Sequence, residues 1–331
     1  MNIFFRCDSS SIIGTGHVVR TLNLAIALKD RNHSITFICR ELSGNISELI
    51  ISQGFNVINL HERETEDYLK RHTPQWIIVD HYDLGEDWEK MVRALGIKLF
   101  VIDDIFRKHS CDVFLDQNFH LKHSDKIEPC LEYQTKRFLG PEFAILSKFF
   151  LDLVPSKKCP GKTCNKIVVF FGGIDITGET LKLLQSPKLK SSKFIFNIII
   201  GNKNPACEKI LELADGIKNV NLKVQISNMA EVLVDADLFL GAGGTTTWER
   251  CYYGIPSLCV ATAKNQIEVA KDLAEAEIHH YLGASSNLSA DEYLAEIESL
   301  ANDYNRRLLY SNNSYNLNVA KKFNQLLDIF D

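Results

Sequence analysis

Short apolar runs alternate with amphipathic stretches along the chain, and this alternation restricts the fold more than any other feature. In the first half, the runs with the length of strands are 2–6, 34–39, 56–60, 76–80 and 98–102. The amphipathic stretches between them are 17–30, 45–53, 64–71 and 86–95. In the stretch 17–30, apolar residues at a helical spacing form one face: Val18, Leu22, Ala25 and Ile26. Strands that alternate with helices predict a parallel sheet covered by crossover helices.

The same pattern restarts after residue 165. The expected strands are 166–171, 194–200, 220–224, 238–240 and 256–260, and His279-His280 marks the start of a late strand. The expected helices are 177–186, 204–214, 228–235, 244–254 and 265–276, and the chain from about residue 291 onward reads as helices only. Between about 117 and 165 the pattern weakens, and prolines favour an interdomain connection there: Pro129, Pro141, Pro155 and Pro160. A chain of 331 residues is long enough for two α/β domains, which we expect at 1–150 and 151–331.

Composition excludes several classes of protein. The formal net charge of −5 argues against a nucleic-acid-binding protein, which would normally be basic. The nine cysteines are odd in number and scattered, and the close pair Cys159 and Cys164 lacks the second pair or the histidines of a zinc site. No apolar run approaches the roughly 18 residues of a membrane span, and the N-terminus begins with a strand rather than a signal peptide. The expected location is the reducing cytoplasm.

Glycine-rich turns follow expected strands in both halves: Gly14-Thr15-Gly16, Gly172-Gly173 and Gly241-Ala242-Gly243-Gly244. Glycine lets the backbone approach a ligand closely, and the start of the following helix attracts an anion. A dinucleotide fingerprint is excluded because Val19 stands where its third glycine would be, and the P-loop motif is absent. For Gly172-Gly173 alone, a tight turn without a ligand is an equally good interpretation.

The turn at Gly244 is more informative because Thr245 and Thr246 follow it. Their hydroxyl and amide groups suit a diphosphate, and Glu249, one helical turn later, suits the vicinal hydroxyls of a ribose. The Asp-x-Asp at 235–237 closes an expected helix and opens a strand, which is not the arrangement of a metal-holding acid pair. Metal dependence is therefore not implied, with no metal ligand among the expected site residues, and the helix dipole can stabilise a leaving diphosphate instead.

Several of these motifs together resemble known families. Two α/β halves, with a glycine turn in the first and a Gly-Gly-Thr helix start ending in Glu249 in the second, resemble the GT-B fold, in which a cleft lies between two Rossmann-like domains. The second half is similar to the N-acetylglucosaminyltransferase that forms lipid II. The segment FRCDSSSIIGTGHVVR resembles the F-R-x-D-S-S-x-x-I-G-x-G-H-x-x-R opening of the UDP-2,4-diacetamido-2,4,6-trideoxy-β-L-altropyranose hydrolases of pseudaminic acid biosynthesis. Further matching segments are VDHY at 79–82, DD at 103–104, GPEFAIL at 140–146, FGG at 171–173 and KNQ at 264–266, whereas Ile174 stands where that family commonly has Thr.

The resemblance implies hydrolysis of the UDP-sugar to UDP and free 2,4-diacetamido-2,4,6-trideoxy-L-altrose. His17 occupies the position of the family's catalytic base, although a loop histidine taken alone is more often a solvated or capping residue. A neutral histidine can take a proton from water, and the start of a helix disfavours its charged form. The Gly-Thr-Gly-His turn offers no second carboxylate as a nucleophile, so a single displacement at C1 with inversion and C–O cleavage is expected. No cofactor is implied.

The resemblance and the turns together give a set of expected substrate contacts: Asp8, Gly14, Gly16, Tyr82, Gly172, Gly173, Gly244, Thr245, Thr246, Glu249 and Asn265. Asp8 and the serines 9–11 are expected to orient His17 or bind the sugar amides, or else only to cap the turn. Asp80 is expected to be a polar anchor behind Tyr82, which is either a substrate contact or part of the core. Asn265 is a substrate contact or the N-cap of helix 265–276, with Glu268 at the capping-box position, or both.

Two other functions stay open from the sequence. A GT-B glycosyltransferase would pass the sugar to an acceptor, and one that acts at a membrane would carry a basic, apolar face near the first domain. No such run occurs before residue 120, and Lys148-Phe149-Phe150 is the nearest. A UDP-sugar-binding regulator would tolerate loss of His17. The expected partners are a small-molecule UDP-sugar and the upstream and downstream enzymes of the same pathway, without nucleic acid. We expect His120 and His123 to be polar residues of the linker.

Overall fold

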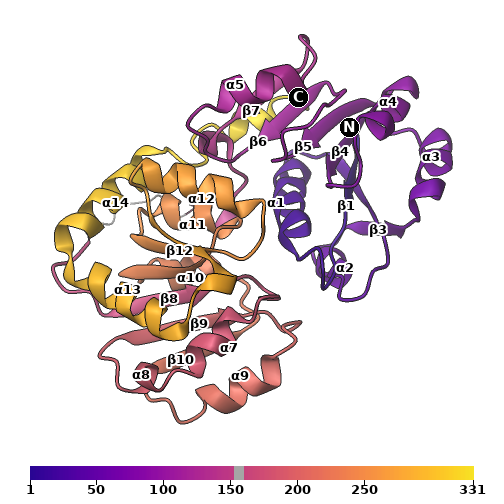
Figure 1. Ribbon diagram of the computed structural model, residues 1–331. Helices are drawn as coiled ribbons and strands as arrows, with labels where there is room; N and C mark the ends of the chain where they lie inside the picture. The colour runs from indigo at the N-terminus through magenta and orange to yellow at the C-terminus, as the bar shows by residue number, and fades with distance from the viewer. Residues whose placement is uncertain (153–159) are drawn as a thin grey trace. The chain divides into compact units, whose positions relative to one another are not determined.

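The computed structural model describes residues 1–152 and 160–331 and separates into two compact α/β units (Figure 1). The first unit consists of Met1–Lys148 together with Ala320–Asp331, and the second consists of Phe149–Val319. The expected division at residue 150 placed residues 320–331 in the second domain, whereas the chain returns to the first unit there. Cys159 and Pro155 lie outside the described residues, and so does any pairing of Cys159 with Cys164. The eight cysteines that are described are free thiols.

The first unit contains a seven-stranded sheet in which every neighbouring pair is parallel, with the order β3-β2-β1-β4-β5-β6-β7. Its strands are β1 (Asn2–Cys7), β2 (Ser34–Cys39), β3 (Asn56–Asn59), β4 (Trp76–Asp80), β5 (Lys98–Ile102), β6 (Val113–Asp116) and β7 (Lys136–Leu139). Its helices are α1 (Gly16–Asp30), α2 (Ser47–Ser52), α3 (Glu62–Arg71), α4 (Glu86–Ala94), α5 (His123–Ile127) and α15 (Asn324–Leu327). The predicted parallel sheet with crossover helices is confirmed, and all five strands expected in this half are present.

The interdomain connection expected from about residue 117 is wrong for residues 117–148, which belong to the first unit. They add β7 to the sheet, and His120 and His123 are packed against Asp116 instead of being polar linker residues. Only a five-residue helix and a three-residue 3₁₀ helix lie between β6 and β7, so the sequence shows no alternation of strand and amphipathic helix there. Pro129 and Pro141 were misleading, since they lie in the first turns of the 3₁₀ helices η1 (Glu128–Cys130) and η2 (Pro141–Phe143), where proline is tolerated.

The second unit contains a six-stranded parallel sheet with the order β10-β9-β8-β11-β12-β13. Its strands are β8 (Lys166–Phe170), β9 (Ile195–Ile200), β10 (Val220–Val224), β11 (Leu238–Ala242), β12 (Ser257–Ala261) and β13 (His280–Ala284). Its helices are α7 (Glu179–Leu184), α8 (Pro187–Lys190), α9 (Cys207–Ala214), α10 (Met229–Leu233), α11 (Thr246–Tyr252), α12 (Gln266–Glu275), η3 (Ser285–Asn287), α13 (Ala290–Asn302) and α14 (Tyr304–Asn316), and α6 (Lys148–Asp152) leads into it. The late strand expected at His279-His280 is confirmed.

The central strands β1, β4 and β11 are buried on both faces, as expected for a parallel sheet between helices. In β1, residues 3–7 are all buried, and in β4 all five residues are buried. The register pairs Cys7 with Asp80, so β1 and β4 end at the same edge of the sheet. The loop after β1 leads directly into α1, and this edge therefore collects the polar residues that follow both strands. Within the described residues, no helix is long and apolar enough to cross a bilayer.

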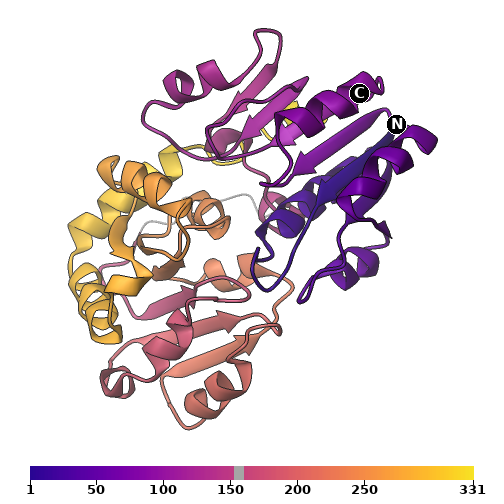
Figure 2. The same ribbon diagram turned by 45° about the vertical axis from the view of Figure 1, so that its right-hand side comes forward.

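The C-terminal segment completes the first unit (Figure 2). The backbone N–H groups of Ala320 and Lys322 donate to the carbonyl oxygens of Pro141 and Glu142. Further along, the buried ring of Phe330 lies 5.1 Å from the ring of Trp76 and 6.1 Å from that of Phe100, measured between centroids. The segment thus contributes to the core of a unit whose other residues lie far away in the sequence.

Candidate active site

His17 is held at the carboxyl edge of the first sheet by an ion-paired carboxylate. Nδ1 of His17 lies 2.5 Å from Oδ1 of Asp80, the last residue of β4. Arg20, one turn after His17 on α1, donates from Nε to Oδ2 and from Nη2 to Oδ1 of Asp80, both at 2.8 Å. Burial opposes ionisation of Asp80, yet Arg20 and His17 hold its pKa well below its usual range.

This arrangement determines which nitrogen of His17 can act as a base. An ionised carboxylate only accepts hydrogen bonds, so Nδ1 of His17 must donate to Asp80 and Nε2 must carry the lone pair. Nε2 makes no hydrogen bond to any residue that the structure describes. The side chain is therefore oriented, in the tautomer that a general base needs, and its second nitrogen is available to a ligand or a water molecule.

Tyr82 lies beside His17, as expected for a contact residue at this edge. The two rings meet edge to face, with centroids 4.7 Å apart and planes at 85°. The Tyr82 hydroxyl donates to Oδ1 of Asp104 at 2.7 Å, and Asn118 donates to the other oxygen of Asp104 at 3.2 Å. Burial and the Asp104 carboxylate raise the pKa of Tyr82, so this hydroxyl stays protonated. Asp80 is thus a partner of His17 rather than an anchor behind Tyr82.

Asp8 does not orient His17, which corrects one of the roles expected for it. Arg6 donates to Asp8 at 2.6 and 3.1 Å, and the backbone N–H and Nε of Arg40 donate at 2.7 and 2.5 Å. Nε2 of His81 lies 2.7 Å from the same carboxylate. Burial raises the pKa of Asp8, but His81 and Arg6 outweigh this effect and hold it well below its usual range. Asp8 therefore fixes β1, β2 and the end of β4 to one another as the centre of an ion-paired cluster.

The loop between β1 and α1 is open where a ligand would need space. Gly14 has a φ of +85°, which favours glycine, and a Cβ on Gly14 or Gly16 would meet nothing within 4 Å. Thr15, at the N-cap of α1, makes no side-chain capping hydrogen bond. Ser10 caps the turn, since its hydroxyl oxygen accepts from the N–H groups of Ile12 and Ile13 at 3.1 and 2.9 Å. The expected capping role is thus confirmed for Ser10.

Arginines were the residues that sequence reasoning overlooked at this edge. Arg107 pairs with Asp103 and donates to the carbonyl oxygens of His81, Tyr82 and Leu84, which fixes the loop that carries Tyr82. Arg20 could have been found, because residues three apart on a helix share a face and His17-x-x-Arg20 has this spacing. The contacts of Arg107 with the loop that carries Tyr82 have no such signal, since His81, Tyr82 and Leu84 lie more than 20 residues away from it in the chain.

In the second unit, the turn after β8 contains a glycine with a positive φ. Gly172 has a φ of +103° and open space where a Cβ would lie. The carbonyl oxygen of Gly173 accepts from the N–H of Gly201 at 2.9 Å, so Gly173 links β8 to the end of β9. Ile174 is buried, so its side chain belongs to the core. Asp175 accepts from the N–H groups of Glu179 and Thr180 at 3.0 and 2.8 Å and thus caps the start of α7.

The turn after β11 divides into a structural part and an open part. A Cβ on Gly241 would collide with the carbonyl oxygen of Phe170 and lie 2.6 Å from the ring of Phe239, so this glycine is required for strand packing. A Cβ on Gly244 would meet only Nε2 of Gln266, at 3.9 Å. The loop that carries Asn265 and Gln266 therefore lies beside the open glycine, in the same unit. Asn265 occupies the expected N-cap position of α12, but its side chain makes no capping hydrogen bond to that helix.

Thr245 and Thr246 begin α11, and Glu249 follows within its first turn. Thr245 makes no side-chain capping hydrogen bond, and Thr246 is buried. Burial raises the pKa of Glu249 to about 7, against a smaller lowering by its hydrogen bond with Thr246. A carboxylate with few partners at a half-buried position is well suited to accept hydrogen bonds from hydroxyl groups of a ligand.

Comparisons with known proteins agree with the resemblances noted in the sequence. No model of a protein family matches the chain. The UDP-2,4-diacetamido-2,4,6-trideoxy-β-L-altropyranose hydrolase of Campylobacter jejuni is 26% identical over 277 residues, which cover 83% of this chain and 97% of that protein. The spore coat polysaccharide biosynthesis protein SpsG of Bacillus subtilis is 22% identical over 93% of this chain and 91% of its own length. The uncharacterized protein MJ1062 of Methanocaldococcus jannaschii is 27% identical over 82% of this chain, and the match covers 58% of that protein.

Solved structures identify the fold. MurG of Acinetobacter baumannii superposes with a TM-score of 0.66 at 15% identity, over 99% of this chain and 98% of that one. The Streptomyces sp. SF2575 glycosyltransferase SsfS6 has a TM-score of 0.62 at 13% identity, over 100% and 99% of the two chains. The chain therefore has the two-domain α/β fold of the GT-B glycosyltransferases and is similar in sequence to a UDP-2,4-diacetamido-2,4,6-trideoxy-β-L-altropyranose hydrolase.

Proposed function

We propose that the protein hydrolyses UDP-2,4-diacetamido-2,4,6-trideoxy-β-L-altropyranose to UDP and 2,4-diacetamido-2,4,6-trideoxy-L-altrose, a step of pseudaminic acid biosynthesis. The likeness to the Campylobacter jejuni hydrolase over 83% of the chain supports the substrate, and the GT-B fold fits a nucleotide-sugar. One observation carries the proposal of hydrolysis. Asp80 and Arg20 hold His17 in the tautomer of a general base, with Nε2 left for a water molecule.

In the proposed reaction, Nε2 of His17 takes a proton from water while the water oxygen bonds to C1 of the sugar. The bond between C1 and the β-phosphate oxygen breaks, and UDP leaves with the bonding electrons. Asp80 stays ionised and stabilises the imidazolium that forms, because its charge faces Nδ1 at 2.5 Å. Tyr82, whose ring edge adjoins His17, is proposed as a contact to the sugar.

We assign the nucleotide to the second unit. Gly172, Gly173 and Gly244 would let the backbone approach the diphosphate, and Thr245 and Thr246 would donate to its oxygens. Glu249 would accept from the ribose hydroxyls, and Asn265 would complete the site beside Gly244. Gly14 and Gly16 would leave room for the sugar next to His17, whereas Asp8 contributes indirectly, through the ion-paired cluster that fixes this edge.

A single displacement with inversion fits the carboxylates near His17. Both oxygens of Asp80 accept from Arg20, and both oxygens of Asp104 accept from Tyr82 and Asn118. Neither carboxylate is therefore placed to attack C1 and form a covalent sugar–enzyme intermediate.

The test is hydrolysis in ¹⁸O-labelled water without any acceptor. We expect UDP of unshifted mass and a labelled, inverted sugar, and we expect His17→Ala to lower kcat by about 10²-fold or more with UDP affinity nearly unchanged. His72→Ala, an exposed histidine on the same unit, is the matched control and should keep full activity. Label in UDP would mean P–O cleavage, and turnover only with an added acceptor would indicate a glycosyltransferase. Near wild-type turnover of His17→Ala would remove His17 from the mechanism.

A further inference from the structure

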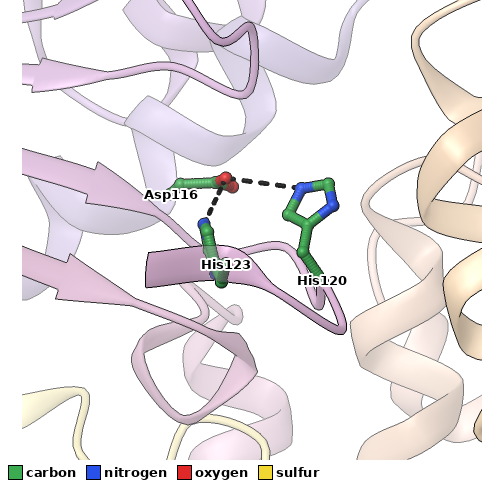
Figure 3. A group of neighbouring side chains, drawn as sticks. All are labelled: Asp116, His120 and His123. Carbon is green, nitrogen blue, oxygen red and sulfur yellow. Dashed lines mark hydrogen bonds and ion pairs between the residues drawn. The ribbon is translucent and has the colours of Figure 1, made fainter. Parts of the chain in front are cut away.

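Three side chains converge on one point at the end of β6, apart from the residues assigned to hydrolysis. Asp116 is the last residue of β6, His120 lies in the following loop, and His123 begins α5 (Figure 3). One carboxylate oxygen and one nitrogen from each ring all lie within 4.8 Å of one another. Among the described residues of the first unit, this is the one group of three such ligands. From this convergence we propose that Asp116, His120 and His123 bind a divalent transition-metal ion, with Zn²⁺ as the best fit.

Of the two distances from Asp116 to the histidine rings, one is that of a hydrogen bond and the other is longer. Nε2 of His123 lies 2.7 Å from Oδ2 of Asp116, whereas Nε2 of His120 lies 3.6 Å from the same oxygen. The second distance exceeds the range of a hydrogen bond. Ligand atoms about 2.0–2.1 Å from a tetrahedral zinc ion are about 3.3 Å apart. Because the three ligand atoms here all lie within 4.8 Å of one another, shifts of at most about 1.5 Å would bring them to an ion.

The chemistry of the three ligands selects the kind of ion. Two imidazoles and one carboxylate are a frequent ligand set for zinc, with water as the fourth ligand. Mg²⁺ and Ca²⁺ are disfavoured because they prefer oxygen ligands. Asp116 and His120 are buried, whereas the side chain of His123 is 11% exposed, which leaves a side open to water.

The position of the site also gives the ion a structural role. The N–H of Asn118 donates to Oδ1 of Asp116 at 2.9 Å, and the side chain of Asn118 reaches Asp104, the partner of Tyr82. Residues 117–131 contain only a five-residue helix and a three-residue 3₁₀ helix, so few backbone hydrogen bonds hold them. An ion bound to His120 and His123 would fix this segment to the sheet, and through Asn118 it would support the loop beside Tyr82.

The test is metal binding by untagged, chelator-treated protein, measured with Zn²⁺ by calorimetry and with Co²⁺ by visible absorption. We expect one equivalent to bind and Co²⁺ to give d–d bands without a thiolate charge-transfer band. His123→Ala, and the milder His123→Gln if the first fails to fold, should weaken binding by at least about 100-fold, because loss of even an outer hydrogen-bond partner costs 10–100-fold. His72→Ala should bind as the wild type does. The proposal is overturned if His120→Ala/His123→Ala binds as tightly as the wild type, or if thiolate bands show that cysteines hold the ion.

The role of the ion has a separate readout. Zn²⁺ should raise the midpoint of thermal unfolding of the wild type and of His72→Ala, because a ligand that binds only the folded state stabilises it. The folded His120→Ala/His123→Ala variant should show no such rise. An equal rise in both would place the ion elsewhere and refute the site.

Discussion

Asp80 is buried at the end of β4 and is nevertheless ionised, because Arg20 and His17 lie against its two oxygens. A single carboxylate thus does two things: it fixes the tautomer of His17 and compensates the charge of Arg20 in a place that water does not reach. The ion pair is a weak source of net stability, since burying both charges costs about as much as their attraction returns. Its value lies in orientation.

We therefore expect Asp80→Asn to lower kcat by about 10²-fold or more, because a neutral amide can donate to Nδ1 and favour the wrong tautomer of His17. UDP affinity should stay close to that of the wild type. Asp83→Asn is the matched control, since Asp83 is largely exposed at the same edge and pairs only with the outer part of Arg40. Steady-state kinetics and UDP titrations measure both effects. Equal losses in the two variants would show that charge at this edge, rather than contact with His17, matters.

Glu249 shows the opposite behaviour, because burial raises its pKa from 4.5 to about 7. Below about pH 4.5 the group is protonated in the folded and the unfolded protein and has no effect on stability. Between pH 4.5 and 7 only the unfolded state loses the proton, so the free energy of unfolding falls as the pH rises. Above pH 7 the folded protein carries the full cost of a poorly hydrated carboxylate.

We expect Glu249→Gln to raise the free energy of unfolding of the second unit by about 2 kcal/mol at pH 8 and by almost nothing at pH 4.5. Urea unfolding followed by Trp248 fluorescence, in a Trp76→Phe/Trp88→Phe background, measures this difference. Glu275→Gln, at an exposed position of α12, should show no such dependence. A gain for Glu249→Gln that is the same at both pH values would contradict the raised pKa.

At the scale of elements, the two ends of the glycine turn after β11 have different roles: Gly241 is needed for packing, and Gly244 leaves room for a ligand. Gly241→Ala should destabilise the second unit by about 1–3 kcal/mol, because its methyl group meets the Phe170 carbonyl oxygen and the Phe239 ring. Gly244→Ala should change stability by less than about 0.5 kcal/mol, since only the end of Gln266 is near, but should weaken UDP binding. Urea unfolding and UDP titration of both variants test this division. If Gly244→Ala is the less stable of the two, the turn has been assigned wrongly.

Strands and helices in the regularly alternating parts of the chain could be predicted from the sequence, whereas β6 and β7 could not. The helix 17–30 and the strands around residues 34–39 and 76–80 were found almost to the residue, because each buries a full face. Between β6 and β7 the sequence shows no such alternation, because only a five-residue helix and a three-residue 3₁₀ helix lie there. His17 could be proposed as a base from its turn and from the resemblance. Its pairing with Asp80 could not, because the two residues are 63 positions apart and only the register of β1 with β4 brings them to one edge.

At the scale of the whole molecule, neither unit corresponds to one half of the sequence. The first unit takes Ala320–Asp331 from the end of the chain, and Arg31 pairs with Asp328 and Asp331 there. These exposed ion pairs contribute little to the free energy of unfolding, so apolar packing must hold residues 320–331 against the rest of the first unit. The buried ring of Phe330, against Trp76 and Phe100, supplies that packing.

We expect Phe330→Ala to destabilise the first unit by about 3–5 kcal/mol and to leave the unfolding of the second unit unchanged. Leu309→Ala, at a half-exposed position on α14 of the second unit, is the control and should affect neither unit by more than about 1 kcal/mol. Hydrogen exchange read out by mass spectrometry separates the two units by their peptides. Faster exchange in β8–β13 than in β1–β7 would contradict the assignment of Phe330 to the first core.

The return of residues 320–331 also sets an order of events on the ribosome. The segment Phe149–Val319 is continuous, so the second unit is fully synthesised before the first has received residues 320–331. Until then the first unit lacks Phe330 and the backbone hydrogen bonds to Pro141 and Glu142. Domains usually mature in the order in which they are made. Here the unit that emerges first becomes complete only after the second has been made, because the apolar surface around Trp76 and Phe100 stays uncovered until Phe330 is available. A nascent chain without residues 320–331 thus exposes apolar surface that the complete first unit buries.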